Sequence, residues 1–418
     1  SASKGAIAPD QAAAVDAVRP GIKALTVDRA ARSVLRKFGL HTGFTHSTGH
    51  GLGLEIHEPP RIGPREEARL AVGMTITIEL NPSQIQSIRE FNEEQAKAIA
   101  AAARAKAIAD GQFVFFAAFD GTNNNADKHV APGQYSTNVW QLWSQYKAAM
   151  TQDNPASGGQ YYPGPGTEKT LTNSSWLPPA VTQQVIATAE QAYEDFAFQA
   201  CEWLGTDGNA GKPVAVALTS FSRGDASAAI FSQLLYQRGL VDPNAPNDVL
   251  IAPGKVKVCT GVIFDPVTTG AAGNLAFAPN VGNVVAVKAL NEYRYLFPSS
   301  DYSNQAGAIT TLGLYGNHCD IGGGYDRGIG ALSLGAATEF LKSSGLPIAA
   351  VQASRTYQPE AIGIHSEEYD EYGKKLWDVT NEDGFSFNPD LRLVVKVGMP
   401  ASPGSAFTLY DGVSVTIA

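Results

Sequence analysis

Short apolar runs alternate with helical stretches along the chain from about residue 113 onward. Four of the runs have the length and composition of buried strands: FVFFAAF, PVAVALTS, KVKVCTGVIF and ITTLGLYG. Helices are predicted over residues 183–204, 226–238 and 332–344. Continuous apolar strands that alternate with helices form parallel sheets covered on both faces. The pattern therefore predicts an α/β fold with a mostly parallel sheet and helices on both faces.

Each apolar run is followed by polar or small residues. In chain order these are DGTNNN, SFSRG, Asp265 and NHCDIGGGY. The carboxyl ends of parallel strands meet at one edge of the sheet, and functional residues collect there. Residues 152–179 are rich in Gly, Pro, Asn and Ser, so we expect them to form a long loop near this edge.

Residues 1–82 have a different pattern. TVDRAARSVLRKFG predicts a helix with an apolar stripe, and GMTITIE predicts a strand. An alanine-rich stretch, residues 83–110, predicts a connecting helix. RLVVKV and SVTIA predict strands near the end of the sequence. We therefore expect an N-terminal segment, a helical connector, a catalytic domain and a C-terminal β appendage, at residues 1–82, 83–112, 113–385 and 386–418.

Composition narrows the class of protein. The net charge of −9 argues against a nucleic-acid-binding protein, which normally has a basic face. Three cysteines are too few for a disulfide framework and are expected to be buried thiols. No apolar run is long enough for a transmembrane helix, and SASKGAIAPD lacks the pattern of a signal peptide. We therefore expect synthesis in the cytoplasm without a signal peptide, with any export by another route.

The stretch VALTSFSRGDASAAIF places Ser222 at a sharp strand-to-helix corner. Such a turn lifts a serine hydroxyl clear of the sheet, above a helix N-terminus that favours negative charge. It needs small residues two positions before and after the serine, and Ser220 and Gly224 satisfy this. The alternative is an ordinary serine cap of the helix. This motif alone favours neither interpretation.

The neighbouring clusters favour a nucleophile. The amides of Gly121 and Thr122, with that of Arg223, are candidate oxyanion donors. Asp265 and His318 follow the serine in the order of an α/β-hydrolase triad, in which histidine takes the serine proton and the carboxylate orients the histidine. The pair Asp320 and His365 is the alternative.

Six motifs in order resemble those of the type VI secretion lipase effectors over residues 113–364. They are FDGTNNN, STNVWQLW, YYPGPGTE, SFSRGDA, IFDPV and GNHCDIGGGYDRGIG. The resemblance implies an α/β-hydrolase domain that cleaves membrane phospholipids in the periplasm of rival bacteria without a cofactor. It also implies Ser222 as nucleophile, Asp265 as acid and His318 as base, with secretion-apparatus and immunity proteins as partners. Departures are Ser220 for glycine, Asp225 for alanine and FDPV for DTV.

A histidine cluster marks the N-terminal segment, with the spacing His46-x3-His50-x6-His57. With VRPG, TGHGLGLEIHEPPRI and GMTITIE, residues 12–79 resemble part of a pita-bread metallopeptidase, the methionine aminopeptidase and prolidase family. The resemblance makes His50 and Glu79 match metal ligands, and His57 a substrate-side histidine. The two bridging aspartates and the last glutamate have no match, and two ligands do not hold a dinuclear centre. We therefore expect a partial pita-bread-like α+β remnant or fusion segment without a metal.

Three functions follow as hypotheses. The first is a serine esterase of the lipase class that acts on phospholipid acyl esters, in which Arg223 holds a phosphate or is simply a surface arginine. The second is a catalytically weak hydrolase scaffold or docking module, suggested by the departures at Ser220 and Asp225. The third is a metallopeptidase, suggested by His50, His57 and Glu79.

Overall fold

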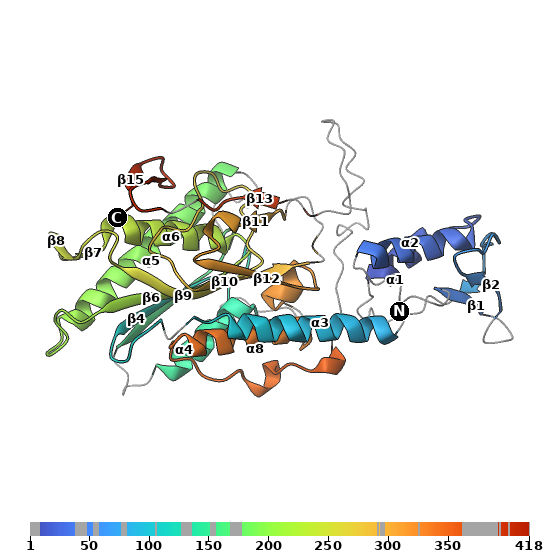
Figure 1. Cartoon of the computed structure of the whole chain (residues 1–418), viewed down its shortest axis with the longest axis horizontal. Helices are drawn as coiled ribbons and strands as arrows, with labels where there is room; N and C mark the ends of the chain where they lie inside the picture. The colour runs from blue at the N-terminus through green and yellow to red at the C-terminus, as the bar shows by residue number, and fades with distance from the viewer. Residues whose placement is uncertain are drawn as a thin grey trace.

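The structure is a computed structural model of the 418-residue chain (Figure 1). It describes residues 9–37, 48–52, 58–76, 82–104, 107–126, 136–150, 156–167, 178–290, 292, 297–324, 327–361, 392, 394–399 and 402–417. No helix in these ranges is long and apolar enough to cross a membrane.

The N-terminal unit combines two helices with a small antiparallel sheet. Its elements are α1 (Pro9–Ala17), α2 (Ala24–Lys37), β1 (Gly49–Leu52), β2 (Glu58–Ile62) and β3 (Thr75–Ile76), and the strand order is β2-β1-β3. The apolar stripe of α2, including Val27 and Ala31, packs with Ile62 and Leu70 in a small core. The predicted helix and strand are both present, although the described part of the strand is short.

A six-stranded parallel sheet organises the larger part of the chain. Its order is β12-β10-β9-β6-β4-β5, and every neighbouring pair runs parallel. The strands are β4 (Phe113–Phe119), β5 (Ser157–Tyr162), β6 (Val214–Phe221), β9 (Lys257–Phe264), β10 (Val284–Ala289) and β12 (Ile309–Leu314). Strands β4 and β6 are buried along their whole length, as their continuous apolar runs predict.

Helices cover both faces of this sheet (Figure 1). On one face lie α5 (Pro178–Leu204) and α6 (Gly224–Arg238), over a core that includes Phe115 and Phe231. On the other face lie α3 (Pro82–Ala101), α4 (Asn138–Ala149) and α8 (Ile329–Ser343), over a core that includes Phe116 and Phe340. The predicted α/β class with a covered parallel sheet is confirmed.

Helix α3 is part of this cover. Asn92 in the middle of α3 accepts a 2.7 Å hydrogen bond from the Tyr315 amide and donates a 2.9 Å bond to the Tyr315 carbonyl. The helix ends at Ala101, earlier than the predicted residue 110. The segment expected as a connector therefore also completes one face of the sheet.

The prediction of one loop over residues 152–179 was wrong in part, because Ser157–Tyr162 form the edge strand β5. The sequence SGGQYY lacks an apolar run, and so its strand character is hidden. Its glycines have a packing reason. A Cβ on Gly158 would lie 2.7 Å from the Phe113 ring, and one on Gly159 would lie 2.5 Å from the Phe116 carbonyl.

Smaller elements surround the sheet. They are β7 (Leu240–Asp242) and β8 (Ala245–Ile251), β11 (Ser299–Asp301) and β13 (Val394–Lys396), β14 (Ala406–Thr408) and β15 (Ser414–Thr416), the helix α7 (His318–Gly322), and 3-10 turns at Ser303–Gln305, Ala353–Arg355 and Pro359–Ala361. The predicted C-terminal strands are present as β13 and β15. Strand β13 pairs with β11 of the larger part of the chain, so it does not stand apart from it.

Candidate active site

The candidate site lies where the strand order reverses. From β4 the chain goes first outward to β5 and then back across β4 to β6. Open parallel sheets form a crevice at such a switch point, beyond the carboxyl ends of the strands. The loop that begins at Asp120 follows β4, and Ser222 follows β6, so both polar clusters lie at this switch point.

Ser222 occupies a strained corner. Its φ is 55°, in the left-handed region that residues with a Cβ avoid, and its amide donates a 3.1 Å hydrogen bond to the Phe264 carbonyl. Helix α6 begins two residues later, its cap residue is Arg223, and the described structure has no side-chain cap bond there. Ser222 is therefore not a helix cap, and the backbone has the form of a nucleophile elbow.

Glycines let three segments meet around this elbow. A Cβ on Gly224 would lie 2.4 Å from the Asp120 carbonyl, and one on Gly164 would lie 1.6 Å from the Gly121 carbonyl. Cβ atoms on Gly121 and Gly322 would lie 2.6 and 2.2 Å from the ring of Phe221. The FDGT, PGPGT, SFSRG and GGG motifs thus pack directly on one another.

Asp120 fixes the loop after β4. Its buried carboxylate accepts 2.7 Å hydrogen bonds from the Gly121 amide, the Thr137 hydroxyl and the Tyr161 hydroxyl. Burial raises the pKa of this carboxyl to about 6. Thr137 also caps α4, so one carboxylate ties the FDGT loop to β5 and to the start of a helix.

Asp265 and His318 are in contact. Asp265 follows β9, and its Oδ2 lies 2.6 Å from Nδ1 of His318, the first residue of α7. Both side chains are buried. Burial acts to raise the pKa of the Asp265 carboxyl, but Arg392 and His318 outweigh it and hold that pKa well below its usual range. The carboxylate therefore stays ionised beside the imidazole.

Two aromatic rings flank the imidazole. The centroids of Phe221 and Phe297 lie 4.5 and 4.8 Å from that of the His318 ring. Phe221 directly precedes Ser222, so the elbow itself supplies one wall for the histidine. The His318 amide donates a 3.2 Å hydrogen bond to the buried carboxylate of Glu292.

The alternative pair is placed only in part. Asp320 accepts a 3.0 Å bond from the Asn317 amide, and its own amide donates to the Asn317 side chain at 2.8 Å. This capping box begins α7 and orients the turn that carries His318. His365 lies outside the described residues.

The candidate oxyanion groups lie at the same edge of the sheet. Gly121 is buried next to Phe221, and the Thr122 hydroxyl oxygen is buried without a hydrogen-bond partner among the described residues. Arg223 is also buried, and this lowers the pKa of its guanidinium to about 10, so it stays charged at neutral pH. Arg223 is therefore not the exposed surface arginine of the alternative interpretation.

Two of the residues that depart from the effector motifs lie beneath the elbow. The Ser220 hydroxyl donates a 3.2 Å hydrogen bond to Asp225, which also accepts one from the Tyr302 hydroxyl. All three side chains are buried, and burial raises the pKa of the Asp225 carboxyl to about 6. Nearby, burial lowers the pKa of the Lys288 ammonium, which donates to the Ser300 carbonyl, to about 8.

Sequence reasoning missed Arg392. Its Nη1 and Nη2 donate 2.6 and 2.8 Å hydrogen bonds to the two carboxylate oxygens of Asp265. A lone arginine before an apolar run carries no signal for this contact, because the partners are 127 positions apart. Glu292 was missed because its partner, the His318 amide, lies 26 positions away along the chain.

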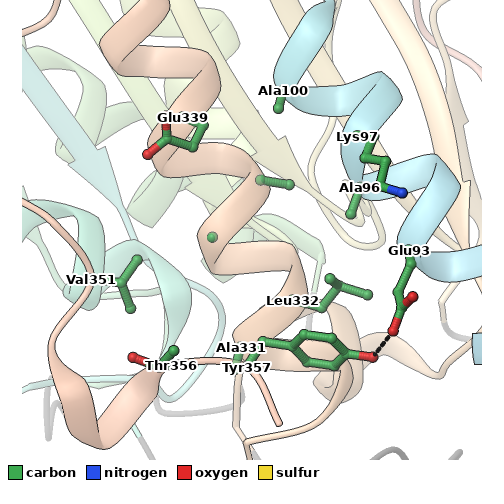
Figure 2. Close-up of a pocket in the computed structure, with 12 residues that line it drawn as sticks. Glu93, Ala96, Lys97, Ala100, Ala331, Leu332, Glu339, Val351, Thr356 and Tyr357 are labelled. Atoms are coloured by element: carbon green, nitrogen blue, oxygen red, sulfur yellow. Dashed lines mark hydrogen bonds between the residues drawn. The ribbon is translucent and has the colours of Figure 1, made fainter. Parts of the chain in front are cut away.

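A separate pocket of about 420 Å³ lies between α3 and α8 (Figure 2). Ala96, Ala100 and Leu332 give it an apolar lining, and the Tyr357 hydroxyl donates a 2.8 Å hydrogen bond to Glu93 at its rim. None of the candidate triad residues lines it.

The N-terminal histidine cluster is described at His50 alone. His50 is buried on β1, while His46, His57 and Glu79 lie outside the described residues. The described ranges hold no group of three or more His, Cys, Asp and Glu side chains that could bind a metal ion.

The N-terminal part of the chain is similar in sequence to known proteins. Residues 9–111 match metallopeptidase family M24. A 69-residue stretch is 49% identical to the Xaa-Pro dipeptidase of Pyrococcus furiosus and covers 16% of this chain and 20% of that protein. The solved dipeptidase of Pyrococcus horikoshii OT3 is 56% identical over 17% of this chain and 20% of its own, with a TM-score of 0.17. The chain spans about a fifth of the length of the curated relatives it matches.

Two solved structures cover more of the chain at low identity. An uncharacterised protein from Pseudomonas aeruginosa is 16% identical, covers 69% of this chain and 53% of its own, and has a TM-score of 0.43. The Tle1 effector bound to the VgrG spike of the type 6 secretion system is 21% identical, covers 54% and 52%, and has a TM-score of 0.39. Both TM-scores lie below 0.5, so these two likenesses carry no argument about function. The chain thus combines a partial M24-like segment with an α/β unit that carries a serine elbow and a bonded Asp–His pair.

Proposed function

We propose that the chain is a serine esterase of the lipase class that hydrolyses acyl esters of membrane phospholipids. The observation that carries the proposal is the strained elbow at Ser222, with φ of 55°, beside the 2.6 Å contact between Asp265 and His318. The phospholipid specificity and the antibacterial effector role rest on the motif resemblance.

In the proposed reaction, the Ser222 hydroxyl oxygen attacks the ester carbonyl while His318 takes its proton through Nε2. Asp265 accepts a hydrogen bond from Nδ1–H of the imidazole and stabilises the imidazolium. The ester C–O bond then breaks, and the lysophospholipid oxygen leaves with the proton from His318. Water cleaves the acyl-serine by the same route, releasing fatty acid and free Ser222.

Backbone amides would stabilise the oxyanion of both steps. The amide of Arg223 follows the nucleophile at the start of α6, and the amide of Thr122 lies on the facing loop, whereas the Gly121 amide already donates to Asp120. The buried guanidinium of Arg223 is the candidate partner for the lipid phosphate.

The decisive experiment measures fatty acid release from phosphatidylethanolamine and phosphatidylglycerol vesicles by wild type, Ser222→Ala and Ser227→Ala. Ser227 is the matched control, because it is a buried serine on α6 whose hydroxyl has no hydrogen-bond partner among the described residues. We expect release by wild type and Ser227→Ala, and its loss in Ser222→Ala. Equal release by wild type and Ser222→Ala would overturn the proposal.

A fluorophosphonate probe separates the esterase from an inert scaffold. Covalent labelling at Ser222, located by peptide mass, requires an activated serine and supports the esterase. A folded protein that neither labels nor releases fatty acid supports the scaffold or docking module instead. The motif resemblance also suggests secretion-apparatus and immunity partners, and a VgrG-type spike is the first to test by co-purification.

A further inference from the structure

Arg392 reaches into the site from a segment remote in sequence. It lies two residues before β13, and β13 pairs in parallel with β11, from Ser299↔Val394 to Asp301↔Lys396. This pairing holds the Arg392 backbone beside the loop that follows β10. The guanidinium enters the buried space around Asp265, and its side chain is only 10% exposed.

Four hydrogen bonds hold the guanidinium. Nη1 and Nη2 grip the two Asp265 oxygens at 2.6 and 2.8 Å, a forked geometry that fixes a carboxylate in its plane. Nε donates to the Phe297 carbonyl at 2.8 Å, and Nη1 also donates to the Ala289 carbonyl at 3.1 Å. The Phe297 ring packs against His318, so Arg392 anchors both the acid and one wall of the imidazole.

We propose that Arg392 is a positioning residue whose guanidinium holds Asp265 aimed at His318 and offsets part of its charge, and thereby sets the pH range in which Ser222 is activated. The inference rests on the proposed esterase function. Without Arg392, the Asp265 charge would act on His318 uncompensated and would favour the imidazolium, which cannot take a proton from serine.

Other charged groups face this pair. Lys288 on β10 is buried and attracts Asp265, and it also faces Asp225 and Asp301. Glu292 lies at the His318 amide, and Asp320 lies on the same short helix. Among these, Arg392 is the cation that hydrogen bonds to Asp265 in the described structure, so it is the one whose removal exposes His318 to the full carboxylate charge.

The test compares the pH dependence of fluorophosphonate labelling at Ser222 in wild type, Arg392→Gln, Arg392→Lys and Arg238→Gln. Arg238 is the matched control, because it makes the same forked pair with Glu190, at 2.6 and 2.8 Å, at the far end of α6. In Arg392→Gln we expect at least a tenfold slower maximal rate, and an acidic midpoint higher by about 1 pH unit. Arg392→Lys keeps the charge and restores the midpoint, but not the rate, because it lacks the fork.

Each outcome decides the inference. An unchanged midpoint in Arg392→Gln overturns it and leaves the esterase proposal intact, provided that wild type labels. Absence of labelling in folded wild type overturns both. If thermal unfolding shows that Arg392→Gln does not fold, Arg392→Lys decides: a wild-type rate overturns the inference, and a slower rate at an unchanged midpoint supports it.

Discussion

Ser220 and Asp225, the two elbow positions that depart from the effector motif, are bonded to each other. The Ser220 hydroxyl donates to the Asp225 carboxylate at 3.2 Å beneath the corner that carries Ser222. Tyr302 donates to the same carboxylate from the loop after β11. The two departures thus form one buried polar pair in place of the glycine and alanine of the motif.

This pairing predicts coupled substitutions. Ser220→Gly and Asp225→Ala should each lower the free energy of unfolding by about 1–3 kcal/mol, because each leaves a buried polar group with fewer partners. The double variant should lose about 1 kcal/mol less than the sum. Urea unfolding of the four proteins measures the cycle, and strict additivity would contradict it. Ser220→Gly should keep esterase activity, because the Ser220 hydroxyl hydrogen bonds to Asp225 and has no part in the proposed reaction.

Stability should fall as pH rises from about 4 to 6. The Asp120 and Asp225 carboxyls have pKa values of about 6 in the folded chain and about 4 in the unfolded one. The folded chain therefore binds more protons in this window, and raising the pH costs up to about 3 kcal/mol for each carboxyl. The low pKa of Asp265 stabilises the folded chain at every pH in this window, and that stabilisation is lost only as the pH falls below about 4. Urea unfolding across this range should show a smaller fall in the Ser220→Gly/Asp225→Ala variant, and equal falls would refute the assignment.

The backbone strain at Ser222 predicts a difference between two inactive variants. Ser222→Ala keeps a Cβ at φ of 55°, whereas Ser222→Gly removes it. Ser222→Gly should therefore be more stable than Ser222→Ala by about 1 kcal/mol in urea unfolding. Equal stabilities would mean that the corner relaxes in solution.

Gly224 should tolerate no side chain. A Cβ there would lie 2.4 Å from the Asp120 carbonyl oxygen, so Gly224→Ala should cost at least about 1–3 kcal/mol and reduce labelling of Ser222. Gly335→Ala on α8 is the control, because its Cβ would meet no atom within 4 Å and alanine favours a helix. Thermal unfolding of both variants tests this, and a wild-type melting temperature in Gly224→Ala would contradict it.

Chelation should leave esterase activity unchanged, because the serine mechanism uses no metal. The test is fatty acid release before and after dialysis against EDTA. A loss that Mn²⁺, Co²⁺ or Zn²⁺ restores would instead favour the metal-dependent chemistry suggested by His50, His57 and Glu79.

The sequence predicts the elbow well because its determinants are local. An apolar strand, a small-residue corner and a helix occur in one stretch, and β6, Ser222 and α6 follow that order. Asp265 is similarly found at the end of β9. The sequence allows two acid–histidine pairs, and Asp265 with His318, 53 positions away, is one of them. The fold resolves the geometry of this pair, because parallel strands bring both loops to one edge.

Other features have no local signal. Strand β5 is hidden because its glycines fit against Phe113 and Phe116 of the neighbouring strand, a requirement visible only once the two strands pair. Arg392 is missed because β13 joins β11 across a long stretch of chain. The hydrogen bond between Ser220 and Asp225 is hidden because the strand-to-helix corner lies between the two residues and brings them together only in the fold.

The pairing of β13 with β11 has a consequence for the order of synthesis. Ser222, Asp265 and His318 all leave the ribosome before Arg392 does. Until then, a folded sheet would hold Asp265 beside His318 without its guanidinium partner, and the uncompensated carboxylate would favour the imidazolium. An imidazolium cannot take a proton from Ser222. The nascent chain would therefore gain the proposed esterase activity last, after its six-stranded sheet has formed.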